Sequence, residues 1–126
     1  MKKIFCTLIL LLFASIGFAA TMSFEQAMKE SKPFAVIIYA PWADGLIPVN
    51  SAFDAIKFKY DGLYNFAKID IATKDAKNFN KTYTIYPNLP YVLLFRNGGK
   101  ITRYIPQECV TDTSCITQKM DAFIQK

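Results

Sequence analysis

The chain contains no histidine among its 126 residues. That absence excludes the Ser-His and Cys-His catalytic arrangements and most zinc sites, because those sites use imidazole as the base or as a ligand. Cysteine is scarce too, with only Cys6, Cys109 and Cys115. A pair of thiols on its own makes a poor metal site, so we expect no metal ion and no cofactor.

The chain also lacks a cluster of basic residues. It has 15 Lys and Arg against 10 Asp and Glu, a formal net charge of +5, and two of the basic residues are Lys2 and Lys3 at the start. Without those two the counts are 13 and 10, and the net charge falls to +3. The remaining basic residues are scattered, as on a solvated surface, and we expect no binding to nucleic acid.

No apolar run reaches the roughly 20 residues that a membrane-spanning helix needs. The longest run, at residues 4–16, follows Lys2 and Lys3 and precedes a Gly-Phe-Ala-Ala stretch at 17–20. This layout is typical of a secretory signal peptide. We predict that residues 1–20 are a signal peptide, removed after Ala19 or Ala20. A retained N-terminal anchor is the alternative.

Residues 21–126 are then expected to form one domain, in the periplasm or secreted, with no membrane contact after cleavage. Cys6 leaves with the signal peptide, and Cys109 and Cys115 remain as an even pair. In an oxidising compartment a disulfide is the expected state of such a pair. A redox-active pair is the alternative, because Cys115 lies near the start of the last predicted helix, where a thiolate is stabilised.

Helical and strand patterns alternate along the predicted domain. An unbroken apolar run at 34–39 is typical of a strand covered on both faces. One apolar helical stripe contains Leu46, Val49, Phe53, Ile56 and Tyr60. The predicted elements are a helix at 23–30, a strand at 34–39, a helix at 46–60, a strand at 63–71, a helix at 73–83, strands at 91–95 and 100–105, and a helix at 116–124. The order α-β-α-β-α-β-β-α predicts an α/β fold with a mixed four-stranded sheet and helices on both faces.

Three local patterns predict where elements begin and end. Residues 23–26 (Ser-Phe-Glu-Gln) match a capping box, in which Ser23 accepts a hydrogen bond from the backbone N–H of Gln26. Gly62 is expected to end its helix in a left-handed conformation. The Asn97-Gly98 pair predicts a β-hairpin with a two-residue turn.

Tyrosine is abundant, with seven residues in the chain. Most are expected at strand and core edges, where the ring is buried and the hydroxyl reaches water. A peptide-binding or carbohydrate-binding surface is the alternative use of such residues.

Several stretches resemble one known family when they are taken in order. They are residues 39–42 (Tyr-Ala-Pro-Trp), residues 89–91 (Leu-Pro-Tyr) and residues 95–100 (Phe-Arg-Asn-Gly-Gly-Lys). Together they resemble the thioredoxin family over nearly all of residues 21–126. The resemblance implies a thioredoxin-like three-layer sandwich and a cis peptide bond before Pro90. It also implies a peptide groove between residues 42–46 and 89–91, where the backbone of Leu89 and Tyr91 would pair with a bound peptide.

The family's Cys-x-x-Cys motif would fall on Ala43, Asp44, Gly45 and Leu46. Ala43 replaces the attacking cysteine and Leu46 the resolving one. Because disulfide exchange needs a thiolate that attacks sulfur, this turn is expected to have no thiol chemistry. Asp44 is expected to cap the helix instead. The loop that contains Cys109 and Cys115 is expected to lie far from the face that carries the active site in this family.

The leading hypothesis is therefore a non-catalytic peptide-binding, protein-binding or chaperone-like module of the cell envelope. Its partner would be a polypeptide or another envelope protein. The predicted groove residues are Trp42, Leu89, Pro90 and Tyr91. The alternative is a thiol–disulfide oxidoreductase that uses Cys109 and Cys115.

Overall fold

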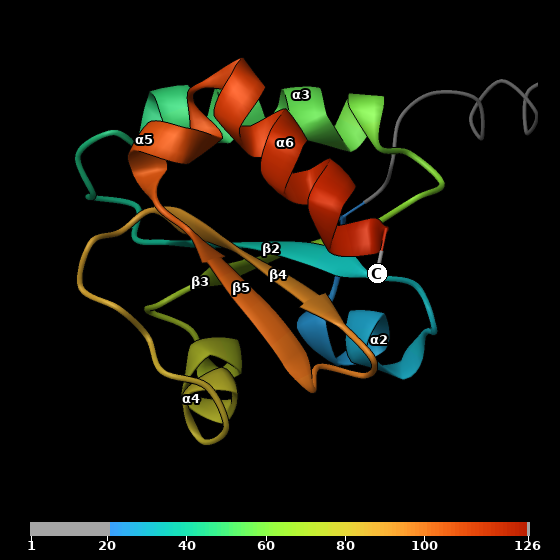
Figure 1. Cartoon of the computed structure of the whole chain (residues 1–126). Coiled ribbons are helices and arrows are strands. Elements are labelled where there is room, and N and C mark those ends of the chain that lie inside the picture. Colours follow the sequence, from blue (N-terminus) through green and yellow to red (C-terminus); the bar gives the residue numbers. More distant parts are fainter. Residues whose placement is uncertain (1–20, 126) are drawn as a thin grey trace, which may run out of the picture.

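The fold was obtained as a computed structural model, which describes residues 21–125 (Figure 1). The predicted signal peptide, its cleavage site and Cys6 lie outside the described residues. Within residues 21–125, none of the helices has both the length and the apolar character needed to cross a membrane.

A five-stranded mixed sheet forms the centre of the molecule (Figure 1). Its strands are β1 (Thr21–Met22), β2 (Phe34–Tyr39), β3 (Asn65–Asp70), β4 (Tyr91–Arg96) and β5 (Ile101–Ile105), in the order β1-β3-β2-β4-β5. The neighbours β1, β3 and β2 are parallel, whereas β4 is antiparallel to β2 and β5 to β4. The four predicted strands are confirmed. A two-residue strand such as β1 is too short to leave a periodic pattern in the sequence.

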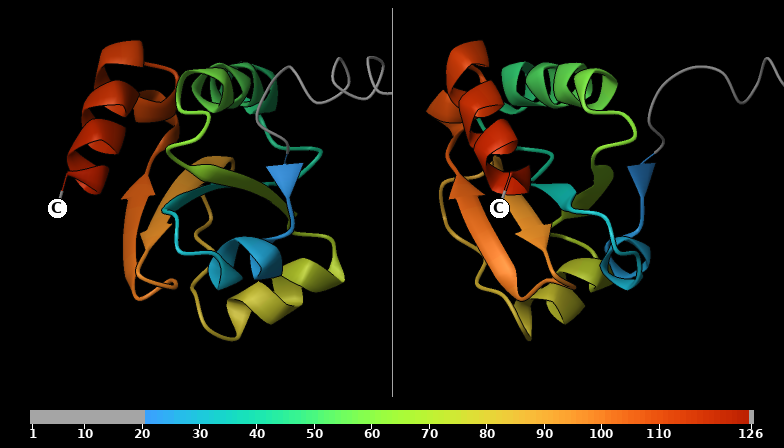
Figure 2. Two further views of the ribbon diagram at one scale, coloured as in Figure 1. Left: turned by 90° about the vertical axis from the view of Figure 1, so that its right-hand side faces the viewer. Right: turned by 45° about the vertical axis from the view of Figure 1, so that its right-hand side comes forward.

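Helices cover both faces of the sheet (Figure 2). One face carries α2 (Phe24–Lys29) and α4 (Lys74–Asn80), and the other carries α3 (Leu46–Lys59), α5 (Gln107–Val110) and α6 (Thr113–Ile124). This arrangement confirms the three-layer α/β prediction. The short helix α5 was not predicted, because four residues give no helical period to detect.

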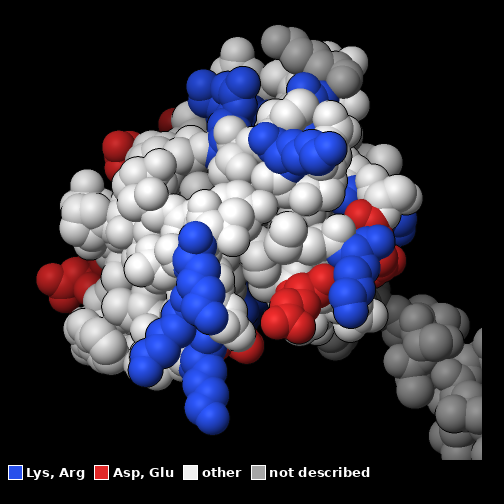
Figure 3. Space-filling view, turned by 90° about the horizontal axis from the view of Figure 1, so that it is seen from below, with Lys and Arg blue, Asp and Glu red and all other residues white. Residues whose placement is uncertain are grey.

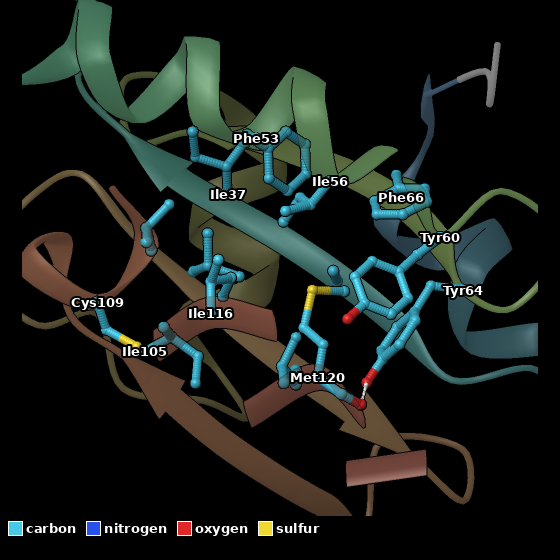
Figure 4. Packing of buried hydrophobic residues seen from close by; sticks show 14 of the residues in the cluster. Ile37, Phe53, Ile56, Tyr60, Tyr64, Phe66, Ile105, Cys109, Ile116 and Met120 are labelled. Atoms are coloured by element: carbon cyan, nitrogen blue, oxygen red, sulfur yellow. Dashed lines mark hydrogen bonds between the residues drawn. The ribbon is translucent and has the colours of Figure 1, made fainter. Parts of the chain in front are cut away.

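Strand β2 divides the core into two halves. Ala35 and Ile37 face the cluster under α3 and α6, whereas Phe34, Val36 and Ile38 face the cluster under α2 and α4. All five residues have 0% exposure, which confirms a strand covered on both faces. Figure 4 shows Ile37 beneath Phe53 and Ile56 of α3 and across from Ile116 and Met120 of α6.

Two of the three predicted element ends are confirmed. The Ser23 hydroxyl accepts a hydrogen bond from the Gln26 N–H at 3.2 Å, at the N-cap of α2. Gly62, just beyond α3, has a φ of +85°, which lets the chain reverse without the strain that a Cβ would cause.

The hairpin between β4 and β5 differs from its prediction. Arg96 pairs with Ile101, so four residues rather than two connect the strands. Three of them, Asn97, Gly98 and Gly99, have positive φ angles. The hydroxyl of Tyr83, from beyond α4, donates to the Gly99 carbonyl at 2.9 Å. The longer turn therefore makes a tertiary contact that the local Asn-Gly pattern does not encode.

The molecular surface over α2 and α4 carries charges of both signs (Figure 3). Some Lys and Arg side chains extend side by side at the lower left of this view, and others lie next to Asp and Glu side chains at the right. The prediction that the basic residues are scattered therefore holds only in part on this face.

Candidate functional site

Three segments far apart in the sequence enclose a groove at one end of the sheet. They are the loop after β2, the loop before β4, and the end of β5 with the start of α5, which lie together at the left of Figure 1. The groove has a volume of about 860 Å³. It is lined by Ala40, Trp42, Ala43, Asp44, Pro87, Asn88, Leu89, Tyr104, Pro106, Gln107 and Glu108.

The structure brings Trp42, Ala43 and Asp44 together with Leu89. Four other residues predicted for this groove are not among its lining residues: Gly45, Leu46, Pro90 and Tyr91. Trp42 is 71% exposed, a large fraction for the residue type that most often contributes to binding sites. Ala43 is half-buried, and its N–H donates to the Ala40 carbonyl at 3.0 Å, which closes the turn. Leu46 is the half-buried first residue of α3.

The prediction that Asp44 caps α3 is wrong. Gly45 occupies the N-cap position with a φ of +82°, and no side chain within residues 21–125 caps α3 with a hydrogen bond. Because Gly45 holds the cap position directly before Leu46, Asp44 lies one residue outside the cap and lines the groove instead. Its carboxylate is therefore free of the capping role that the sequence suggested.

The peptide bond between Leu89 and Pro90 is cis, as the family resemblance implied. The Leu89 N–H donates to the Pro87 carbonyl at 2.9 Å, and the Leu89 carbonyl accepts a hydrogen bond from Gln107 Nε2 at 2.7 Å. Tyr91 has 0% exposure and stands opposite Ile38 inside the sheet. The expectation that Leu89 and Tyr91 offer a free backbone to a peptide is therefore wrong, because the first is bonded within the chain and the second is buried.

Gln107 is a groove residue that the sequence analysis missed. Its side chain extends from α5 to the carbonyl of Leu89 and also lies close to Gly45. A Cβ added to Gly45 would lie 2.8 Å from Gln107 Oε1, which is closer than such atoms normally approach. One side-chain amide thus contacts both loops that form the groove. A single glutamine after a proline carries no sequence pattern that would reveal this contact.

Three tyrosines from separate segments form an aromatic platform beside the groove. Ring centroids are 5.0 Å apart for Tyr86 and Tyr104, 5.0 Å for Tyr91 and Tyr104, and 5.7 Å for Tyr86 and Tyr91. The buried Tyr91 hydroxyl accepts a hydrogen bond from the Tyr86 N–H at 2.9 Å. Burial raises the pKa of Tyr91 to about 12. Tyr86 and Tyr104 are 42% and 37% exposed, so their rings are available to a ligand.

The groove has an acidic lining. Asp44 and Glu108 are its charged residues, and no Lys or Arg is among the lining residues. Elsewhere in residues 21–125, no three His, Cys, Asp or Glu side chains come together in a group that could hold a metal ion.

The predicted disulfide between Cys109 and Cys115 is present, with an S–S distance of 2.05 Å. The expectation that this loop lies far from the groove is wrong, because Gln107 and Glu108 immediately before Cys109 line the groove. Cys109 is 5% exposed and packs in the core under α3 and α6. Asp112 caps α6 by accepting a hydrogen bond from the Cys115 N–H at 3.2 Å.

No protein-family model and no curated protein matches the chain. Its structure is similar to a chain in the crystal structure of a complex of ferredoxin:thioredoxin reductase and thioredoxin f2. The TM-score is 0.64 at 14% sequence identity, and the match covers 85% of this chain and 98% of the other. Similarity at this level of identity concerns the fold alone. The chain therefore has a thioredoxin-like fold, as its sequence predicted.

Proposed function

We propose that this protein is a non-catalytic polypeptide-binding module of the cell envelope, which holds its partner in the groove beside Trp42. The observation that carries the proposal is the exposure of Trp42, 71%, at the rim of a groove of about 860 Å³. Covering an exposed indole with a partner removes apolar surface from water, which favours binding, and tryptophan is among the residues that contribute most to binding.

The chemistry of the turn supports binding without thiol exchange. Ala43 and Leu46 stand where the family resemblance would place two cysteines, and neither side chain can attack a disulfide or leave from one. A polypeptide would therefore dissociate from this groove unchanged.

The Cys109–Cys115 disulfide is proposed to act as a structural cross-link. Burial of Cys109 supports this role, because an attacking thiolate needs access to a sulfur atom. Trapping of free thiols in glutathione buffers is the test. A reduction potential below about −300 mV is expected for a structural disulfide, whereas about −120 to −230 mV would favour the oxidoreductase alternative.

The binding proposal is tested by titrating the isotope-labelled protein with an unfolded polypeptide and following backbone amide signals by NMR. We expect shifts confined to the groove, at residues such as Ala43, Asn88 and Glu108. Trp42→Ala should weaken binding by about tenfold or more. Phe58→Ala is the matched control, because Phe58 is 73% exposed but lies in the last turn of α3. Unmoved groove amides at saturating polypeptide would refute the proposal.

Export is also part of this proposal. The N-terminal residue of the protein purified from its producing cells should be Ala20 or Thr21, corresponding to cleavage after Ala19 or Ala20. N-terminal sequencing that begins at Met1 would contradict cleavage and favour a retained anchor.

A further inference from the structure

We infer that the groove takes a proline-rich segment in the polyproline II conformation, with a Lys or Arg beside the prolines. This inference rests on the proposed polypeptide-binding function and specifies the chemical class of its partner. It differs from the strand-like pairing that the family resemblance suggested.

The backbone of Leu89 and Tyr91, where the family resemblance placed strand pairing, is not free to pair with a peptide. A peptide that adds as a β-strand needs free N–H and C=O groups on the receiving edge. The Leu89 N–H is bonded to Pro87, its carbonyl to Gln107, and Tyr91 has no exposed surface. A polyproline II segment needs no such pairing, because it has no ladder of backbone hydrogen bonds and each proline lacks an N–H.

Three exposed aromatic side chains offer what a proline-rich segment requires. Trp42 lines the groove, Tyr104 lines both this groove and a neighbouring hollow, and Tyr86 lines that hollow. Within residues 21–125, neither the Trp42 indole N–H nor the hydroxyls of Tyr86 and Tyr104 make a hydrogen bond. Their rings can pack against prolines while these donors bind the carbonyls of the segment, as in other aromatic-lined grooves.

The aromatic platform is fixed before any ligand arrives. The rings of Tyr86 and Tyr104 contact each other and the buried Tyr91, whose hydroxyl accepts the Tyr86 N–H. A rigid receptor surface and a stiff polyproline ligand both lose little conformational entropy on binding. The match in rigidity favours a proline-rich segment over a flexible chain.

The acidic lining of the groove is the reason to expect a Lys or Arg in the bound segment. The groove lining contains Asp44 and Glu108 and no Lys or Arg, and both carboxylate residues are exposed. A Lys or Arg next to the prolines would approach these carboxylates, which favours this partner over acidic segments and speeds its association.

The test uses the emission of Trp42, the only tryptophan in the chain. The purified protein is titrated with a short peptide of Pro-x-x-Pro repeats flanked by one arginine. We expect a saturable change in emission, binding about tenfold weaker when the prolines are replaced by alanine, and several-fold weaker when the arginine is replaced by glutamate. Equal affinity for the proline and alanine peptides would overturn the inference.

Variants locate the site, with affinities measured by calorimetry. Tyr104→Ala should weaken binding about tenfold, and Tyr104→Phe should retain part of the affinity because it keeps the ring. Asp44→Lys is a second variant at an exposed position outside the helices, so it tests the groove even if Tyr104→Ala fails to fold. Phe58→Ala should bind like the original protein. Unchanged affinity in both Tyr104→Ala and Asp44→Lys would overturn the inference.

The outcome also separates this inference from the proposed function. If a proline-free unfolded polypeptide shifts the groove amides and the proline-rich peptide does not bind, the inference fails and the polypeptide-binding function stands. If neither binds, both fail. Saturable quenching of Trp42 by a neutral oligosaccharide, without peptide binding, would overturn the inference in favour of a carbohydrate site.

Discussion

Replacing Gln107 by alanine should lower the free energy of unfolding by about 1 kcal/mol. The substitution removes the 2.7 Å hydrogen bond from Gln107 Nε2 to the Leu89 carbonyl. A hydrogen bond between neutral groups contributes roughly 0.5–1.5 kcal/mol net, and stranding a fully buried partner costs about 1–3 kcal/mol. Leu89 is half-buried and lines the open groove, so water can reach its freed carbonyl and the lower range applies.

Urea unfolding followed by circular dichroism is the assay, with Gln118→Ala as the matched control. Gln118 lies on α6, is exposed, and makes no side-chain hydrogen bond within residues 21–125. A loss of about 1 kcal/mol corresponds to a fall in melting temperature of roughly 4–8 °C for a domain of about 100 residues. The reasoning is refuted if Gln107→Ala and Gln118→Ala unfold at the same urea concentration.

The same variant should change the ligand preference of the groove. Removing the Gln107 amide frees the Leu89 carbonyl to accept a hydrogen bond from a peptide N–H. Extended peptides without proline should therefore bind more tightly to Gln107→Ala than to the original protein, by a few-fold for one added hydrogen bond. An unchanged affinity for such peptides would show that the Leu89 carbonyl does not face the ligand.

Further predictions concern buried tyrosines, the disulfide and Gly45. Tyr64→Phe should lower the free energy of unfolding by about 1–2 kcal/mol, because it removes the 2.7 Å hydrogen bond from the buried Tyr64 hydroxyl to the Met120 carbonyl (Figure 4). In the same urea assay, removing an exposed tyrosine hydroxyl that makes no hydrogen bond should leave this free energy almost unchanged. Cys115→Ser should lower the free energy of unfolding by about 2 kcal/mol, which is the chain-entropy estimate for a cross-link between residues 6 apart in the sequence. Added reductant should then cause no further loss of stability in this variant. Burial raises the pKa of Tyr60 from 10.0 to about 12, so the free energy of unfolding should be unaffected by this group below pH 10 and should fall toward pH 12, because the unfolded chain then loses a proton that the folded chain keeps. Tyr60 alone lowers it by at most about 1.4 kcal/mol per pH unit, and Tyr91, whose pKa is also raised to about 12, adds to the fall; a flat unfolding profile over that window would contradict this. Gly45→Ala should lower the free energy of unfolding by about 1–2 kcal/mol because of its left-handed backbone, and by a further amount because the new Cβ would clash with the Gln107 side chain. The double variant with Gln107→Ala removes this clash, so its loss of stability should be smaller than the sum of the two single losses.

Local patterns in the sequence were sufficient for the layers of the fold. The run at 34–39 is apolar at every position, and its short length and β-branched residues favour a strand covered on both faces. The stripe of Val49, Phe53 and Ile56 repeats at helical spacing, and all three residues pack in the core. Ser23 and Gly62 mark element ends through their own side chain or its absence. Each of these signals acts within a few residues of the chain.

The candidate site was only partly predictable. The sequence placed Trp42, Ala43 and Leu89 at one groove through the family resemblance, and it indicated the Cys109–Cys115 disulfide through cysteine counting. It predicted correctly that the helix begins at Leu46, but it assigned the cap to Asp44 because a carboxylate is a common cap. The cap position belongs to Gly45, in a left-handed conformation.

The sequence by itself determined the order of elements, the two-sided core and the absence of sulfur from the turn at 43–46, because these properties depend on residue type and short-range spacing. The tertiary structure alone decided that the Gln107 amide bonds to Leu89, 18 residues away, and that Tyr86, Tyr91 and Tyr104 form one platform. Such contacts form only when separate loops and strands pack against one another. A side chain that bonds to a distant backbone carbonyl produces no periodic pattern in the sequence, so the sequence cannot predict it.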